Sequence, residues 1–392
     1  MIKIFHLSDL HLGALRDRYL IKCEDKALNE VIKVAEREQP DFIVISGDIF
    51  DSNIPSISRV ARMAEFLKSL KEMKISTYAI YGSHDFSPTR STMVEVLSRG
   101  GLMKVIEGSI EDRGVYLAGA HGRVGALEVK EFPVFPSPPE NVPSIFAFHT
   151  AITEAVMGRI VMKAEQMMPA SKLPKGFTYY AGGHVHKRIE WRYNGSPLNY
   201  PGPLFIGYGI DDLEDYLKGE DRGFYVVELD ERNAKFRYYR IRPVEGKFSQ
   251  VEADGLSSEE VVREVETRLK GLRRGEIALL KLRGTLKSGR RAEVVSKVER
   301  IRESLKAQDI YLYVNDRNLL DPKLKEAPKE EKKDKYLEDL VKLFPEEADV
   351  KLITAIIDAL GVEKAQGMKK EVYEKQVIQE VKKLIGEIKC IS

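Results

Sequence analysis

The stretch STYAIYGSHD, residues 76–85, joins an apolar run to a cluster of polar side chains. Residues 76–81 predict a buried strand, and residues 82–85 place a glycine, Ser83, His84 and Asp85 directly after it. The apolar runs 2–7 and 41–46 also end in Gly, Asp, Ser or His, and residues 25–38 and 56–72 have helical periodicity. Alternating strands and helices predict a layered α/β sheet, and such sheets bind ligands beyond the carboxyl ends of their strands.

The rest of the chain divides by composition. Residues 115–242 are rich in strand signals and predict a two-layer continuation of the same domain, 1–242. Residues 243–320 predict helix, strand, helix and strand, a small second α/β domain. Residues 321–335 hold six lysines, five acidic residues and two prolines, which predicts a linker. Residues 336–392 contain three amphipathic helical patterns, and this tail either folds back on the body or docks on a partner.

Bulk composition excludes some classes of protein. No apolar run approaches the roughly 20 residues that a membrane span needs. Two cysteines cannot form a disulfide framework or a thiolate metal cage. No signal peptide is visible, so a cytoplasmic location is expected. The net charge of +2 neither supports nor excludes binding to nucleic acid. Residues 268–302 are locally basic, and they form either a solvated face or a surface that contacts phosphates.

The histidines point to chemistry. Seven occur in the chain, and none follows His186. Together with carboxylates, most of them fall into five short clusters, namely Asp9-x-His11, Gly47-Asp48, Gly82-Ser-His84-Asp85, His149 and His184-x-His186. Residues i and i+2 of an extended segment point the same way, so each paired cluster can aim two ligands into one cavity. The remaining two, His6 and His121, are expected in the core and in a loop.

Imidazole and carboxylate ligands without thiolate suit Mn, Fe or Zn, and they argue against a structural zinc site. A carboxylate such as Asp48 can bridge two ions about 3.5 to 4 Å apart, an arrangement that clamps a phosphoryl group and activates water. Each cluster alone is weak, whereas the five in this order predict a two-metal hydrolase.

The motifs DLHLG, SGDIF, GSHD, FHT and GGHVHK resemble, in this order, the five phosphoesterase motifs of the calcineurin-like metallophosphoesterase superfamily. Residues 1 to about 240 resemble its SbcD-type nucleases, the meiotic-recombination-eleven family of DNA double-strand-break repair. HLSDLHLG near the N-terminus, GHVHKR followed by YNGSPLNYPGP, and the order of second domain, linker and helical tail carry this closer resemblance. It implies a two-sheet metallophosphoesterase domain flanked by helices, a small α/β capping domain and a C-terminal helical tail.

The resemblance also implies roles for single residues. Asp9, His11, Asp48 and His186 would hold one metal, and Asp48, Ser83, His149 and His184 the second. His84 would protonate the departing 3′ oxygen, with Asp85 orienting its ring. The implied cofactor is a pair of divalent ions, with manganese expected.

The implied function is a DNA nuclease with 3′–5′ exonuclease and single-strand endonuclease activities. It would act on double-stranded ends and single-stranded DNA at the nucleoid. The implied partners are a second copy of the chain, through helices near 56–72 and 90–98, and an SbcC-type SMC-like coiled-coil ATPase, through residues 336–392.

Three residues depart from the family pattern. Ser83 stands where relatives usually carry asparagine, Asp51 where many carry histidine, and YPGP replaces YPGS. At Ser83, either a water replaces the lost ligand, or the second metal binds weakly, or the chain is a scaffold for DNA ends with little catalysis. A small-molecule phosphodiesterase or phosphoprotein phosphatase on the same metals is the remaining alternative.

Overall fold

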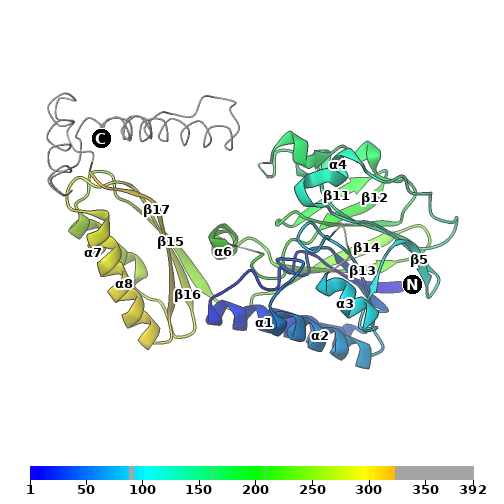
Figure 1. The fold of residues 1–392 in the computed structure, drawn as a ribbon, viewed down its shortest axis with the longest axis horizontal. Coiled ribbons are helices and arrows are strands. Elements are labelled where there is room, and N and C mark those ends of the chain that lie inside the picture. The colour runs from blue at the N-terminus through cyan, green and yellow to red at the C-terminus, as the bar shows by residue number, and fades with distance from the viewer. Residues whose placement is uncertain (88–91, 161, 208, 323–392) are drawn as a thin grey trace, which may run out of the picture. The chain divides into compact units, whose positions relative to one another are not determined.

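The computed structural model describes residues 1–87, 92–160, 162–207 and 209–322 (Figure 1). The pattern of contacts between residues divides the chain into a compact unit, Met1–Asp321, and residues 322–392. The predicted helical tail and all but the first two residues of the predicted linker therefore lie outside the described residues.

Two six-stranded sheets form the larger body of the described chain. The strands of the first sheet, in spatial order, are β14 (Ala234–Arg240), β13 (Gly223–Leu229), β1 (Ile2–Leu7), β2 (Phe42–Ser46), β3 (Ser76–Ile80) and β4 (Lys104–Val105). The strands of the second are β11 (Ile189–Tyr193), β12 (Ser196–Tyr200), β10 (Tyr179–Gly183), β7 (Ser144–His149), β6 (Val115–Ala120) and β5 (Gly108–Asp112). In the first sheet β1, β2 and β3 run parallel, as β6, β7, β10 and β12 do in the second. The predicted two-sheet layered α/β fold is therefore confirmed.

Helices, 3-10 turns and two short strands complete this body. They are α1 (Arg18–Glu38), α2 (Ile57–Glu72), α3 (Met93–Arg99), η1 (Val124–Ala126), α4 (Leu127–Lys130), β8 (Ala151–Ile152), α5 (Thr153–Val156), η2 (Ala164–Gln166), β9 (Met167–Met168), η3 (Ala170–Lys172) and α6 (Gly209–Leu217). Helix α1 begins seven residues before its predicted start, because the Asp17 carboxylate accepts hydrogen bonds from the amides of Tyr19 and Leu20. It ends at Gln39, which adopts the left-handed conformation common after a helix.

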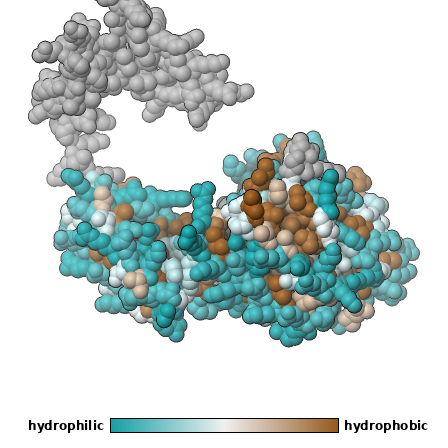
Figure 2. Space-filling model, turned by 60° about the horizontal axis from the view of Figure 1, so that its bottom comes forward, coloured by the Kyte–Doolittle hydropathy of each residue, from teal (hydrophilic) through white to brown (hydrophobic). Residues whose placement is uncertain are grey.

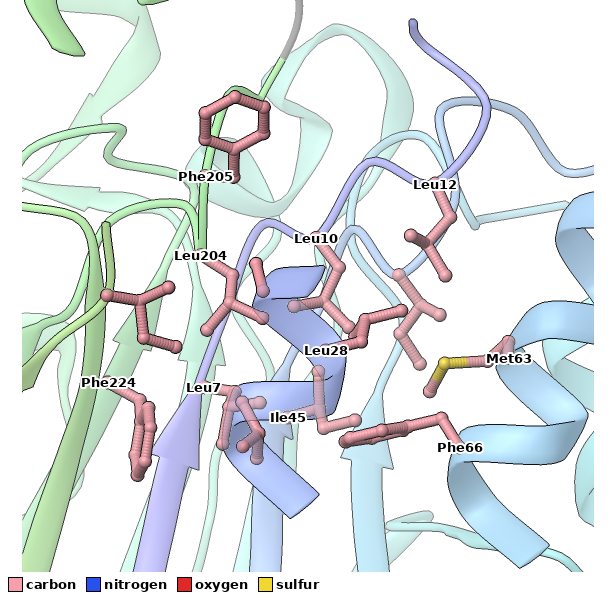
Figure 3. Close-up of a cluster of buried hydrophobic side chains, with 14 of the residues drawn as sticks. Leu7, Leu10, Leu12, Leu28, Ile45, Met63, Phe66, Leu204, Phe205 and Phe224 are labelled. Carbon is pink, nitrogen blue, oxygen red and sulfur yellow. The ribbon is translucent and has the colours of Figure 1, made fainter. Parts of the chain in front are cut away.

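Apolar layers lie on both sides of the first sheet. Between the two sheets, fully buried side chains such as Val44 and Tyr78 meet Ala147 and Tyr179. On the other face, Leu28 of α1 and Met63 and Phe66 of α2 pack against Leu7 and Ile45 of the sheet (Figure 3). Burying a side chain of this size stabilises the fold by about 1.5–3 kcal/mol. The helices and the second sheet thus fix β1, β2 and β3 from both faces.

The smaller part of the unit is a three-stranded parallel sheet, β15 (Gly246–Glu252), β16 (Ile277–Thr285) and β17 (Tyr311–Leu320). Helices α7 (Ser258–Leu269) and α8 (Arg291–Ala307) cover one face of it (Figure 1). The sequence prediction of helix, strand, helix and strand missed β15. Its stretch GKFSQVE carries few apolar residues, and the strand is only partly buried, so the hydrophobic pattern gave little signal there.

The surface carries both polar and apolar regions. Figure 2 shows apolar side chains gathered on part of the larger body, among polar surface. Exposed large apolar residues on or beside α2 and α3 include Ile54, Ile57 and Val96. No helix in the described ranges is both long enough and apolar enough to cross a bilayer.

Candidate metal centre

Loops that follow five strands meet at one edge of the two sheets. The strands are β1, β2 and β3 in the first sheet and β7 and β10 in the second. Backbone hydrogen bonds join the first two loops, from the amide of Asp9 to the carbonyl of Gly47 (3.1 Å) and from the amide of His11 to the carbonyl of Asp48 (3.0 Å). The amide of His184 donates to the Asp9 carboxylate at 3.0 Å, which ties in the loop after β10. The edge predicted to bind ligands is thus formed by the predicted clusters.

The backbone at this edge is strained. Asp9, His11, Asp48 and His184 all adopt positive φ, at 53°, 45°, 50° and 84°. For residues other than glycine this conformation is uncommon and costs of order 1–3 kcal/mol, and it concentrates at functional sites. Four of the seven predicted ligands therefore have their directions set by an unfavourable backbone conformation that the surrounding fold maintains.

Glycines allow the loops to approach each other closely. A Cβ at Gly82 would lie 2.1 Å from Asp48 Oδ1 and 2.2 Å from the Asp48 amide nitrogen. A Cβ at Gly47, where φ is +86°, would lie 2.4 Å from His149 Nδ1. Real Cβ atoms essentially never show contacts under 3.0 Å, so a side chain at either position would push the loops apart.

One group of side chains brings together Asp9, His11 and His186, which can each offer a ligand atom within 4.8 Å of the others. The Nε2 atoms of His11 and His186 are 3.0 Å apart, and His186 Nε2 lies 3.9 Å from Asp9 Oδ1. Asp9 and His11 are fully buried. These three residues can hold one metal ion, as the sequence predicts.

Asp48 lies between this group and a second one. Its Oδ2 is 3.6 Å from His11 Nε2 and 3.1 Å from His149 Nε2. Asp9, Asp48 and His149 also meet the 4.8 Å criterion, as do His11, Asp48 and His84. One carboxylate thus faces nitrogen ligands on two sides, which is the geometry expected of a residue that bridges two ions.

His149 provides a direct test of whether a metal fits. Its ring is buried, and its Nδ1 lies 2.7 Å from the carbonyl of Ser46, to which it can donate a hydrogen bond. Its Nε2 lies 3.1 Å from an oxygen of the buried Asp48 carboxylate, with which it pairs when the ring is protonated. A metal-ligating histidine usually donates its other N–H to a carbonyl or a carboxylate, as the Nδ1 of His149 can donate to Ser46. The residues present fit a metal.

Electrostatics divides the histidines into two kinds. Burial lowers the pKa of His184 to about 3 and that of His11 well below its ordinary value, so both rings are neutral. Burial also lowers the pKa of His149, but the Asp48 carboxylate outweighs it and raises the value to about 10. The same pairing holds the pKa of Asp48 far below its usual range, despite the burial that opposes it. Burial raises the pKa of Asp9.

His84 and Asp85 lie in the same loop but have different surroundings. The His84 side chain is one-third exposed, and its amide donates to Asp48 Oδ1 at 2.8 Å. Its Nδ1 lies 2.8 Å from the carbonyl of Asp51. The buried Asp85 carboxylate accepts from the amides of Ile49 (2.9 Å), Phe50 (3.0 Å) and Gly82 (3.3 Å). Burial raises its pKa to about 7, against these three amides, which favour the charged form.

The expected role of Asp85 is therefore corrected. Sequence reasoning made it the residue that orients the His84 ring, whereas the contacts of its carboxylate join the loop after β2 to the loop after β3. The backbone carbonyl of Asp51 orients the ring instead. The partner of the ring, the Asp51 carbonyl, belongs to the loop after β2, so adjacency in the sequence did not reveal it.

Ser83 and His184 are less closely joined to the cluster. Ser83 is half-buried in the turn before His84. The His184 ring lies 5.3 Å from the His149 ring, centroid to centroid, but His184 belongs to none of the groups within 4.8 Å that the described residues form. The structure thus brings the His184 ring next to His149 and places Ser83 in the turn that carries His84.

Two contributors were missed by sequence reasoning. Asp212 of α6 lies with its Oδ2 3.0 Å from His186 Nδ1, and together with Asp9 it raises the pKa of His186 against the effect of burial. The Ser46 carbonyl holds His149. Asp212 belongs to none of the five motifs, and Ser46 opens the SGDIF motif but contributes its backbone carbonyl, which residue type does not reveal. Of the two histidines outside the pattern, His6 hydrogen-bonds to Tyr179 and Ser46 in the core, as expected, and His121 accepts from the amide of Tyr81.

The model of the family described as calcineurin-like phosphoesterase matches residues 2–188. These residues therefore form a calcineurin-like phosphoesterase domain, and over this part of the chain the superfamily recognised from the five motifs is confirmed.

The particular relatives are archaeal proteins, each named DNA double-strand break repair protein Mre11. The chain is 28% identical over 241 residues to that of Saccharolobus solfataricus, covering 58% of this chain and 61% of the relative. It is 24% identical over 325 residues to that of Sulfolobus acidocaldarius, covering 79% and 82%. It is 27% identical over 327 residues to that of Methanopyrus kandleri, covering 76% and 67%. The chain thus spans about three fifths of the length of the first of these relatives.

Proposed function

We propose that this chain is a two-metal DNA nuclease that processes double-strand breaks. The observation that carries the proposal is the position of the Asp48 carboxylate, 3.6 Å from His11 and 3.1 Å from His149, between two sets of buried ligands. Similarity to repair proteins named Mre11 supports DNA as the substrate.

The proposed ligands fall into two sets. Asp9, His11, Asp48 and His186 hold the first ion, and Asp48, His149, His184 and position 83 hold the second. The absence of thiolates and the mixed nitrogen and oxygen donors favour manganese. Two divalent ions at such a site polarise a phosphodiester and lower the pKa of water.

His84 is the proposed general acid. A hydrogen bond from its Nδ1 to the Asp51 carbonyl fixes the ring, so the imidazolium form presents the Nε2–H as the proton to transfer. The ring is one-third exposed and its amide donates to the proposed bridging carboxylate, so it can reach a substrate phosphate held at the same place. In this role, His84 donates its proton to the departing 3′ oxygen. Asp85 stabilises the loop that carries His84 by accepting hydrogen bonds from backbone amides.

The second part of the chain is the proposed cap on the DNA. We divide the chain into a nuclease domain (1–242), a capping domain (243–320), a linker (321–335) and a partner-binding tail (336–392). In the basic segment 268–302, six arginines form ion pairs with carboxylates, namely Arg268, Arg273, Arg274, Arg283, Arg291 and Arg302. This pairing favours a solvated face for those six, so phosphate contacts fall to other lysines and arginines of the segment, such as Lys287 and Lys297.

The proposal includes partners and activities. The exposed apolar side chains of Ile54, Ile57 and Val96 support a homodimer through the helices near 56–72 and 90–98. The tail would bind an SMC-like coiled-coil ATPase of the SbcC type, at the nucleoid in the cytoplasm. Removing residues 336–392 should then abolish capture of that ATPase and leave intrinsic cleavage unchanged; capture by the truncated chain would place the contact elsewhere.

The test of the nuclease proposal is cleavage of DNA by the purified chain. Blunt duplexes and single-stranded circles, each with Mn²⁺, separate 3′–5′ exonuclease from endonuclease activity. His84→Ser should lower the rate by about 10²–10⁴-fold, the usual contribution of a general acid. The control is Mn²⁺ binding, which this variant should retain. No cleavage by the wild type under any metal, or an unchanged rate in His84→Ser, would contradict the proposal.

A second candidate is a scaffold that binds DNA ends and hardly turns over. Ser83 favours it, because a neutral hydroxyl on a short side chain is a poorer ligand than the amide usual in the family. Under this alternative the wild type binds DNA ends and cleaves them slowly. A gel shift with DNA ends also distinguishes the nuclease and the scaffold from a small-molecule phosphodiesterase or phosphoprotein phosphatase, which should not bind DNA.

A further inference from the structure

Helix α6 (Gly209–Leu217) lies between the candidate metal centre and the three-stranded sheet. Asp212 and Glu214 are two residues apart on this helix, and such residues project about 200° apart around the helix axis. Both residues are buried, at 8% and 7% exposure over the whole residue, although both are acidic. A buried carboxylate is unfavourable without a partner, so the two contacts that follow explain why the helix carries these residues there.

On one face, Asp212 binds the candidate ligand His186. Its Oδ2 lies 3.0 Å from His186 Nδ1, and the backbone carbonyl of Asp212 accepts from the buried guanidinium of Arg222 at 3.3 Å. The pair is enclosed, because a Cβ at Gly207 would lie 2.5 Å from His186 Cε1 and 2.8 Å from Asp212 Oδ2. The His186 ring therefore has little freedom to turn while α6 stays in place.

On the opposite face, Glu214 binds the three-stranded sheet. The Nζ atom of Lys281, on β16, lies 2.8 Å and 3.2 Å from the two oxygens of Glu214. The side chains of this pair are 23% and 9% exposed, so water screens it weakly. The Glu214 side of α6 is thus joined to the sheet by this ion pair. Elsewhere on the helix, the Tyr216 hydroxyl donates a hydrogen bond to the carbonyl of Val244, just before β15.

We propose that α6 is a mechanical link between the second domain and the metal centre, with Asp212 as the positioning residue for His186. The inference rests on the proposed role of His186 as a metal ligand. Accepting the Nδ1–H of His186 fixes the tautomer in which the Nε2 lone pair faces Asp9 and His11. Lys281, through its ion pair with Glu214, holds α6 in the position from which Asp212 can accept this hydrogen bond.

The physical basis is that the carboxylate partner of a ligating histidine sets the direction and basicity of the ring. Loss of such a partner typically weakens metal binding by about 10–100-fold. A link through a rigid helix predicts that a change on β16, in the second domain, reaches the metal centre although Lys281 is not one of the proposed metal ligands. Movement of the second domain would then change how firmly the first ion is bound.

The experiment titrates the full chain with Mn²⁺ alone, without DNA, and follows binding by calorimetry and by the electron paramagnetic resonance signal of the free ion. Asp212→Ala should weaken one Mn²⁺ site by about 10–100-fold. Asp212→Asn keeps an oxygen that can accept the Nδ1–H and should retain most of the affinity. Asp211→Ala removes the same charge from the exposed neighbouring position of α6 and should bind as the wild type does.

The second arm tests the link. Lys281→Met keeps the length of the side chain, removes the ion pair with Glu214 and should weaken the same site by several-fold. Lys306→Met removes an equal charge from an exposed position of α8, outside the proposed DNA-contacting segment, and is the matched control. Thermal melts without metal establish that each variant is folded; if Asp212→Ala does not fold, Asp212→Asn and Lys281→Met still decide.

Mn²⁺ binding by Asp212→Ala, or by Lys281→Met, within about twofold of the wild type would overturn the inference, since both variants leave the ligands themselves intact. Weaker binding in both, with both controls unchanged, is the result expected. These measurements use no DNA, so failure of the nuclease proposal appears separately, as normal Mn²⁺ binding without cleavage.

Discussion

Replacing Gly82 by alanine is expected to disable the site through a single methyl group. The new Cβ would lie 2.1 Å from Asp48 Oδ1 and 2.2 Å from the Asp48 amide nitrogen. Ordinary van der Waals contact begins at 3.4 Å. The loops after β2 and β3 would therefore have to separate by about 1.2 Å, the difference between 3.4 and 2.2 Å, because a backbone atom cannot turn away as the end of a side chain can.

That separation is large on the scale of the site. It would lengthen the 2.8 Å hydrogen bond from the His84 amide to Asp48 Oδ1 to about 4 Å, beyond the range of a hydrogen bond. Both the proposed bridging carboxylate and the proposed general acid would move. A misplacement of about 1 Å can cost about 10²-fold in rate, and overpacking typically destabilises a protein by about 1–3 kcal/mol.

The assay compares DNA cleavage, Mn²⁺ affinity and the midpoint of thermal unfolding for Gly82→Ala with those of Gly100→Ala. Gly100 follows α3, away from the predicted ligands, and a Cβ there would lie 3.2 Å from its nearest atom, the Val96 carbonyl oxygen, so small adjustments suffice. We expect Gly82→Ala to lose about 10²-fold in rate with weakened metal binding, and Gly100→Ala to stay near the wild type. A Gly82→Ala enzyme within threefold of the wild type would refute the argument from close approach.

Two further predictions concern the metals. Ser83→Asn should strengthen the weaker Mn²⁺ site and raise the cleavage rate by about tenfold, since the amide oxygen reaches further than the hydroxyl; an unchanged rate would mean that Ser83 does not limit activity. The second concerns pH: with a pKa of about 10, raised by Asp48 against burial, His149 is protonated in the metal-free protein at neutral pH. An ion must displace that proton, so Mn²⁺ affinity should rise by about tenfold per pH unit between pH 6 and 9, with proton release in calorimetry; affinity independent of pH would contradict this.

The sequence predicted what depends on local pattern. Strand β1 has the predicted bounds, and β2, β3 and α2 each differ from the prediction by one residue at one end. The strands were predicted well because each is an apolar run that ends at a polar residue or a glycine. The convergence of Asp9, Asp48 and His149 follows from parallel strands that end at the same edge. The early start of α1 was missed although the sequence carries its signals, namely the helix-capping residue Asp17 and the apolar Tyr19, Leu20 and Ile21 that follow it.

The remainder depends on tertiary contacts that no local pattern encodes. Asp212 follows a stretch with no motif, lies 26 positions from His186, and is one of several acidic residues in α6. Nothing in the sequence marks which of them turns inward. The partners of Asp85 are likewise backbone amides of residues 49 and 50, brought near only when β2 and β3 pair. Motifs therefore predicted the candidate ligands, and the structure added the residues that contact them.

The account depends most on Asp48 as the carboxylate between two ions. Equilibrium titration with Mn²⁺ of the wild type and of Asp48→Ala tests it directly, with unfolding followed in parallel. Two ions per chain in the wild type, and a large loss of affinity at both sites in the variant, is the predicted result. A single ion in the wild type, or one full-affinity site remaining in Asp48→Ala, would contradict it.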